Sequence, residues 1–133
     1  MKKFNKILLV EDQDIDAFLT EKVLLMAEVS DSISICKDGE EALTYIQDIC
    51  RKKNANESIP ELILLDINMP RMNGIEFLHE LRRKYEKDFT VVILSSSENP
   101  QDVALSAKYN VDYYLVKPIT EDKVKKMVER LFY

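Results

Sequence analysis

Residues 62–70 read LILLDINMP, an apolar run that ends abruptly on the carboxylate of Asp66. Three other short apolar runs end on polar residues in the same way: 7–10 on Glu11 and Asp12, 91–94 on Ser95, and 113–116 on Lys117. Such runs are typical of strands buried on both faces of a parallel sheet. The carboxyl ends of these strands converge on one crevice, where ligands usually bind. The sequence therefore predicts three acids, a hydroxyl and a lysine in one crevice, which suits a divalent cation and a phosphoryl group.

Strand-like and helix-like segments alternate along the whole chain, which predicts an α/β fold built on a parallel sheet. The second strand alternates Ile33 and Ile35 with serines, so one of its faces is expected to meet solvent and the strand suits an edge. The expected strands are 5–10, 31–36, 61–65, 90–95 and 112–116, and the expected helices are 14–28, 39–52, 73–86, 99–109 and 120–132.

Apolar side chains recur at helical spacing in these helices and predict their inward faces. The first helix has Ile15, Phe18, Leu19, Val23 and Met26, the second has Ala42, Leu43, Ile46, Ile49 and Cys50, the third has Leu78, Leu81 and Tyr85, and the last has Val124, Met127, Val128 and Leu131. Helix 99–109 has the least apolar cover, so we expect it to be the most weakly held.

Length and composition bound the class of protein. The chain has 133 residues, of which 46% are hydrophobic and 32% charged, as expected for one globular domain. With 19 basic and 24 acidic residues the net charge is −5, which argues against a nucleic-acid partner. No apolar run resembles a signal peptide or a membrane span, so a cytoplasmic protein without membrane attachment is expected. Cys36 and Cys50 have no metal-ligand or redox spacing and are expected to be buried or half-buried thiols.

No repeat or second domain is visible, and the last expected helix runs to the C-terminus. We therefore expect one domain over 1–133 with no output domain. The polar loop 51–60 is the longest irregular stretch, and the sequence does not reveal its role.

The acids at the strand ends predict metal-assisted phosphoryl chemistry. The ionised Asp66 is a usable nucleophile toward phosphorus, but it repels phosphoryl oxygens unless a cation intervenes. Mg²⁺ prefers one or two carboxylates, water and phosphate oxygens, and Glu11 and Asp12 supply further carboxylates. Without a metal, three adjacent acids raise one another's pKa, so the cluster itself favours a bound cation. Asp14 is expected to cap the first helix instead.

The other strand ends fit the same chemistry. Lys117 can reach a phosphoryl oxygen as a point charge, and Ser95 can donate a hydrogen bond to another. Lys117 precedes Pro118, so a cis peptide bond is plausible there. Gly74, eight residues after Asp66, is expected to serve a backbone requirement.

Taken in order, these features resemble the receiver domain of bacterial two-component response regulators, which histidine kinases phosphorylate on aspartate. The resemblance covers the full chain: an acidic pair after the first strand, D-x-N-M-P-x-x-x-G from Asp66, a hydroxyl after the fourth strand and Lys-Pro after the fifth. It implies a flavodoxin-like, doubly wound five-stranded parallel sheet in the order 2-1-3-4-5 with five helices. Ser95 stands where threonine is commoner, and Asn110-Val111 replaces a common Gly-Ala, with Asn suited to a left-handed helix stop.

The resemblance also implies a role for each site residue. Asp66 would be the phosphoacceptor, and Asp12 a ligand of Mg²⁺ or Mn²⁺, with Glu11 acting directly or through water and the Asn68 backbone carbonyl as a further ligand. Lys117 would contact the acyl phosphate. Ser95 and Tyr114 would be the switch hydroxyl and switch aromatic, acting on a surface of helix 99–109, strand 112–116 and helix 120–132.

The implied partners are a sensor histidine kinase or a histidine phosphotransfer protein, and an unknown downstream protein. The chain would be a monomer or a phosphorylation-linked dimer. It would be a signalling phosphoacceptor with slow autodephosphorylation and not an enzyme.

Three other functions would make different demands on these residues. A phosphatase of the haloacid-dehalogenase type has a second Asp two residues after its nucleophile, where this chain has Asn68. A flavin-binding module needs a phosphate loop after the first strand, and the acids at 11–14 would repel that phosphate. A pseudo-receiver that never takes phosphate disagrees with the complete set of site residues.

Overall fold

The structure is a computed structural model that describes residues 4–51, 59–67, 74–85, 89–96, 104 and 107–132. Its strands form one sheet in the order β2-β1-β3-β4-β5, and every neighbouring pair is parallel. The elements are β1 (Ile7–Val10), α1 (Asp14–Met26), β2 (Ile33–Cys36), α2 (Gly39–Arg51), β3 (Leu62–Asp66), α4 (Gly74–Lys84), β4 (Thr90–Ser95), β5 (Tyr113–Val116) and α6 (Glu121–Phe132). The predicted fold class and strand order are confirmed.

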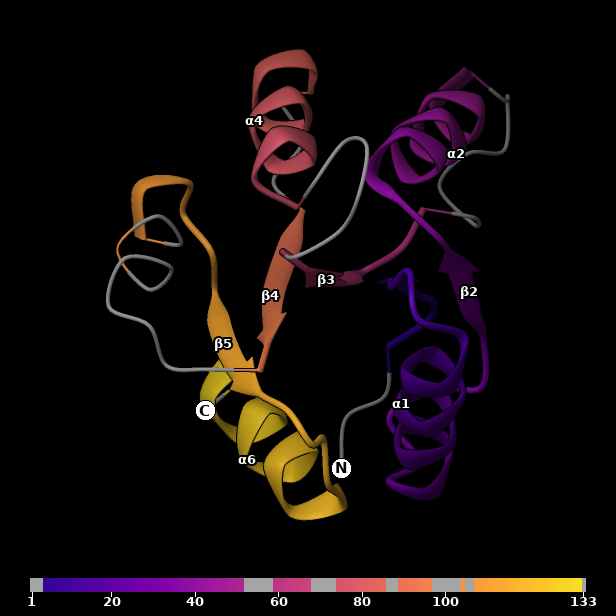
Figure 1. The fold of residues 1–133 in the computed structure, drawn as a ribbon, viewed down its shortest axis with the longest axis vertical. Coiled ribbons are helices and arrows are strands. Elements are labelled where there is room, and N and C mark those ends of the chain that lie inside the picture. Colours follow the sequence, from indigo (N-terminus) through magenta and orange to yellow (C-terminus); the bar gives the residue numbers. More distant parts are fainter. Residues whose placement is uncertain are drawn as a thin grey trace.

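Helices cover both faces of the sheet, with α2 and α4 on one face and α1 and α6 on the other (Figure 1). Alternate residues of each strand point to opposite faces, so each strand contributes side chains to two separate cores. Leu8 and Ile63 contribute to the core under α2 and α4, whereas Leu9 and Leu64 contribute to the core under α1 and α6. Because β1, β3 and β4 are buried on both faces, their residues are almost wholly apolar until the strand ends.

The inward faces predicted for α2, α4 and α6 are largely confirmed. Ile46, Leu78 and Met127 are fully buried, together with most of the apolar positions beside them. Cys50 is the exception, because it lies exposed near the end of α2, whereas Cys36 at the end of β2 is buried. Burial raises the pKa of the Cys36 thiol to about 12, so it behaves as a small apolar core residue.

The inward face predicted for α1 is wrong at four of its five residues, and Val23 alone of the five packs against the core. Ile15, Phe18 and Met26 are exposed by 74%, 60% and 58%, and Leu19 is exposed as well. The buried residues of α1 are instead Ala17, Thr20 and Leu24. Apolar residues occur around most of this helix, so spacing alone does not identify the face that packs. The buried face therefore combines two small side chains with one leucine, while most of the bulky apolar side chains of the helix lie on the outside.

The helix ends show how the chain reverses direction. α1 begins at Asp14, but its N-cap is Gln13 and no side-chain cap bond forms, so the cap expected of Asp14 is wrong. The helix ends at Met26, two residues before the expected end, and Glu28 has a left-handed φ of 57°. Asn110 has a φ of 56°, which confirms the helix stop expected there.

The helix expected over 99–109 lies mostly outside the described residues, although 104, 107 and 108 within it are helical. The loop 51–60 likewise lies mostly outside them. Among the described residues, no helix has the length and apolar character needed to span a membrane.

Candidate functional site

The sheet brings its polar strand ends together at one edge. Glu11 follows β1, Asp66 and Ser95 are the last residues of β3 and β4, and Lys117 follows β5. The Lys117 backbone N–H donates to the Ser95 carbonyl oxygen over 2.7 Å, which aligns the ends of β4 and β5. The convergence of these residues, predicted from four separate apolar runs, is confirmed.

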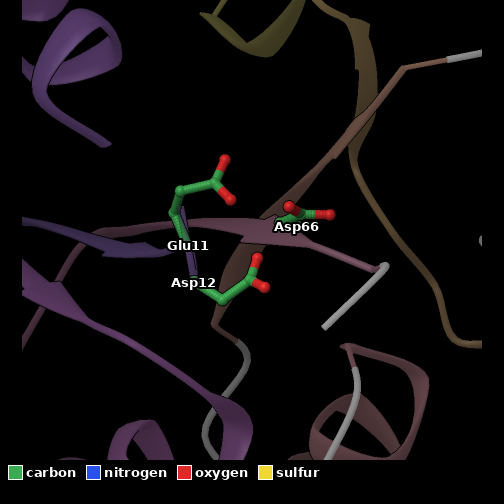
Figure 2. Close-up of side chains that lie close together, drawn as sticks. All are labelled: Glu11, Asp12 and Asp66. Atoms are coloured by element: carbon green, nitrogen blue, oxygen red, sulfur yellow. The ribbon is translucent and has the colours of Figure 1, made fainter. Parts of the chain in front are cut away.

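Three carboxylates form a compact cluster. Glu11, Asp12 and Asp66 each have an oxygen within 4.8 Å of the others. Figure 2 shows Glu11 and Asp12 extending from the end of β1 beside Asp66 on the neighbouring strand. Glu11 and Asp66 are only 1% and 5% exposed, while Asp12 is half-buried. Clustered carboxylates are the ligand set that suits a hard divalent cation, so the residues present fit Mg²⁺ or Mn²⁺.

Lys117 supplies the positive charge of the site. Its Nζ lies 2.6 Å from Glu11 Oε1, 3.2 Å from Asp66 Oδ2 and 3.2 Å from Asp16 Oδ2. The ammonium group of Lys117 therefore contacts three carboxylates, which come from the residue after β1, from α1 and from the end of β3. Its contact with Asp66 places it beside the predicted phosphoacceptor. The Lys117–Pro118 peptide bond is cis, as its sequence allowed.

The electrostatics of the site follow from this crowding. The pKa of Glu11 is raised to about 7, chiefly because the side chain is buried and also because its contact with Asp66 raises the pKa more than the neighbouring Lys117 lowers it. Burial alone would lower the pKa of Lys117, but the hydrogen bond to Glu11 and the charge of Asp66 outweigh it and raise that pKa. The ammonium stays charged, and the buried acids compete for it.

Sequence reasoning missed Asp16. It lies in the first turn of α1, directly after the acidic pair, and helical side chains lean toward the N-terminus of their helix. Its position next to the crevice was the feature of the sequence that could have indicated a role for Asp16 in the site. The acid was overlooked because it lies outside the motif on which the family resemblance rests.

Gly74 fills the backbone role expected of it, through close approach and not through a positive φ. A Cβ on Gly74 would lie 2.5 Å from Ile67 Cα and 2.7 Å from the Asp66 carbonyl oxygen. The start of α4 therefore touches the backbone directly under the site, which only glycine permits.

The two remaining site positions differ in what the structure describes. Tyr114 lies half-buried in β5, paired in register with Ile93, and packs against the core under α2 and α4. Asn68 lies outside the described residues.

A comparison with known families matches residues 7–129 to the response regulator receiver domain. The chain belongs to this family. It is 36% identical to the response regulator Rcp1 of Synechocystis sp. over 124 residues, which cover 92% of this chain and 83% of Rcp1. The receiver assignment implies a histidine kinase as partner. It makes the protein a signalling phosphoacceptor and sets aside the phosphatase and flavin-binding alternatives.

Solved receiver structures share its architecture. The bacteriophytochrome response regulator RtBRR superposes with a TM-score of 0.82 at 32% identity, covering all of this receiver chain and 80% of RtBRR. The Mn²⁺-bound form of Rcp1 superposes with a TM-score of 0.73 at 35% identity, covering 92% of this chain and 88% of Rcp1. This receiver is thus similar to a bacteriophytochrome response regulator in one case and to a Mn²⁺-bound response regulator in the other.

Proposed function

We propose that this receiver accepts a phosphoryl group on Asp66 from a phosphohistidine of a sensor kinase or a phosphotransfer protein. The observation that supports it most directly is the buried Asp66 with Lys117 Nζ 3.2 Å away and two further carboxylates in the same cluster. That arrangement holds a carboxylate nucleophile, a cation for the phosphoryl oxygens and ligands for a metal in one place.

The metal proposed for this site is Mg²⁺, with Mn²⁺ as a substitute. Asp12, Glu11 and Asp66 would hold it, together with the backbone carbonyl of Asn68. The Mn²⁺-bound form of a 35% identical relative supports the choice of a divalent cation. When bound, the ion neutralises negative charge on the phosphoryl oxygens and on the acids that surround them.

The transfer itself needs only positioning and charge stabilisation. A carboxylate oxygen of Asp66 forms a bond to phosphorus as the bond between phosphorus and the donor imidazole nitrogen breaks, and the electron pair returns to that nitrogen. Lys117 donates to a phosphoryl oxygen as charge spreads over it. Asn68 stands where an aspartate would act as a general acid and base, so we expect slow loss of the phosphoryl group by hydrolysis.

We further propose that phosphorylation changes an output surface made of residues 99–109, β5 and α6. Ser95 ends β4, and its hydroxyl would be drawn toward a new phosphoryl oxygen. Tyr114, on the adjacent β5, would then move toward the space left behind, which biases the output surface toward a second state. A downstream protein would read that state. A cytoplasmic location and a monomer or phosphorylation-linked dimer remain predictions.

The exposed side of α1 is the surface we assign to the phosphodonor protein. Asp16 of α1 touches Lys117, so this helix borders the phosphorylation site. A protein that brings its phosphohistidine to Asp66 must cover the adjoining surface. Ile15, Phe18 and Leu19 expose apolar area there without any packing role that requires it.

Intact-mass spectrometry after adding acetyl phosphate tests the proposal. One adduct of phosphoryl mass is expected only with Mg²⁺; it should be labile to hydroxylamine and absent from Asp66→Ala. An Mg²⁺-independent adduct, or one that persists in Asp66→Ala, would contradict the assignment. No adduct in a protein that still binds Mg²⁺ would instead indicate a pseudo-receiver whose acids only hold a metal.

A further inference from the structure

We propose that Asp16 is a positioning residue for phosphoryl transfer, which keeps the Lys117 ammonium group directed at Asp66 throughout the reaction. This inference rests on the proposed phosphorylation of Asp66. It concerns a side chain from α1, whereas the other contacts of Lys117 come from strand ends.

The geometry singles out Asp16 among the acids around Lys117. Asp16 Oδ2 and Asp66 Oδ2 are each 3.2 Å from Lys117 Nζ, so the ammonium is shared between them. The Lys117 side chain is 18% exposed and that of Asp16 is 43% exposed. Asp16 therefore lies at the rim of the site and Lys117 reaches inward beneath it.

The other two contacts of Lys117 must change during the reaction. Glu11 and Asp66 belong to the metal-binding cluster, and Asp66 becomes an acyl phosphate. In the described part of the chain that cluster comprises Glu11, Asp12 and Asp66, and Asp16 lies outside it. Asp16 is thus the carboxylate that can hold Lys117 before, during and after transfer.

A lysine needs such a constraint more than an arginine would. Its ammonium is a point charge on a flexible stem with no fixed direction of hydrogen bonding. A contact at the α1 side would limit where the ammonium can go while Glu11 holds a metal ion. The expected consequence is a faster transfer step, because the cation is already in place when charge develops on the phosphoryl oxygens.

A simpler explanation for Asp16 is a favourable interaction with the helix dipole. A second acid in the same turn allows that explanation to be tested. Acids in the first turn of a helix interact favourably with the helix dipole, whatever else they touch. Asp14 lies in the same turn of α1, is 85% exposed and pairs with Lys37 at 3.9 Å. Asp14→Asn therefore removes an equivalent charge from the same helix end and leaves the contact with Lys117 intact.

The experiment measures the rate of phosphorylation by acetyl phosphate at saturating Mg²⁺, followed by intact mass. We expect Asp16→Asn to lower the rate constant about fivefold, a modest effect for a partly exposed ion pair, while Asp14→Asn stays within about twofold of wild type. Asp16→Glu should recover most of the rate, because it restores a carboxylate within reach of Lys117. Thermal melting of each variant checks that the fold is retained.

A double-mutant cycle shows whether Asp16 acts through Lys117. In the background of Lys117→Ala, adding Asp16→Asn should change the rate less than about twofold, since the group that Asp16 positions is gone. An equal loss with and without Lys117, or equal rates for Asp16→Asn and Asp14→Asn, would overturn the proposal. If the wild-type protein takes no phosphoryl group on Asp66, the proposed function itself is refuted. The wild type alone gives that result, so it can be distinguished from a failure of the proposal for Asp16.

Discussion

At the scale of single residues, Lys117 supplies the positive charge that faces the acids of the site. Its ammonium contacts Glu11, Asp16 and Asp66, and Asp12 adds another carboxylate beside them. Negative charge therefore exceeds positive charge in the metal-free site. A phosphodonor, itself an anion, would be repelled until a divalent cation has bound.

Gly74 offers a test at the same scale. Gly74→Ala places a methyl group against Ile67 Cα and the Asp66 carbonyl oxygen, so the start of α4 or the end of β3 must shift. We expect a loss of about 1–3 kcal/mol in the free energy of unfolding, as for other overpacked sites. Slower phosphorylation by acetyl phosphate should accompany it, because Asp66 moves with its backbone. Urea unfolding and intact mass measure the two effects, and an unchanged stability would contradict the close approach.

The elements show which features spacing can predict and which it cannot. The inward faces of α2 and α6 could be predicted because each has one apolar side and one charged side. The inward face of α1 could not be predicted in this way, because its largest apolar side chains lie outside and Ala17 and Thr20 lie inside. The contacts of Arg82 could not be predicted either. In the sequence it is one of two adjacent arginines, and only the tertiary structure distinguishes them.

Arg82 joins the end of α4 to the residue before β4 and to the turn at 109–110. Its guanidinium group donates to the carbonyl oxygens of Phe89, Tyr109 and Asn110 over 3.0–3.2 Å. Arg82→Lys cannot reproduce this planar set of donors, so we expect the free energy of unfolding to fall by about 1–3 kcal/mol.

Its neighbour provides the matched control. Arg83 pairs with Glu80 at 2.7 Å and its side chain is 59% exposed, so Arg83→Lys should change stability by less than about 0.5 kcal/mol. Urea denaturation of both variants makes the comparison. Equal effects would mean that the backbone contacts of Arg82 contribute nothing specific.

The outer face of α1 gives a second test at this scale. Phe18 is 60% exposed, so Phe18→Ser should leave stability and phosphorylation by acetyl phosphate nearly unchanged. Transfer from a protein phosphodonor that phosphorylates the wild type should fall about tenfold, because an aromatic contact is lost. Leu25→Ser, toward the other end of the helix, is the control. Equal loss with acetyl phosphate and with the protein donor would contradict a docking role.

The whole molecule explains why so much of the site was predictable. A parallel sheet with both faces covered forces its central strands to be apolar, so any polar residue at a strand end stands out in the sequence. The strand order then brings those ends together. Asp16 escaped prediction because a helix, and not a strand, delivers it. The sequence could indicate that α1 begins nearby, but not which of its residues faces Lys117.

Stability of the whole domain should depend on pH and metal together. The raised pKa of Glu11, about 7, means that the fold favours its protonated form. The stability from this group is thus fully present below its ordinary pKa of 4.5 and is lost as the pH rises through about 7. We expect metal-free protein to lose on the order of 3 kcal/mol over this range. Mg²⁺ should oppose that loss, because it binds the ionised acid and the folded state together.

Thermal melting between pH 4.5 and pH 8, with Mg²⁺ or with EDTA, measures this dependence. Glu11→Gln is the control, since it cannot ionise and should flatten the profile of the metal-free protein. A metal-free profile that is the same in wild type and Glu11→Gln would show that another group is responsible.

The outward bulky side chains of α1 have an evolutionary consequence. Because Ile15, Phe18 and Leu19 contribute little to the core, they can be exchanged by mutation at almost no cost to the fold. The inner side, with Ala17 and Leu24, is held to its present residues by packing. After gene duplication, a copy of this protein could therefore acquire a different signalling partner through a few surface changes while its phosphorylation chemistry stayed intact.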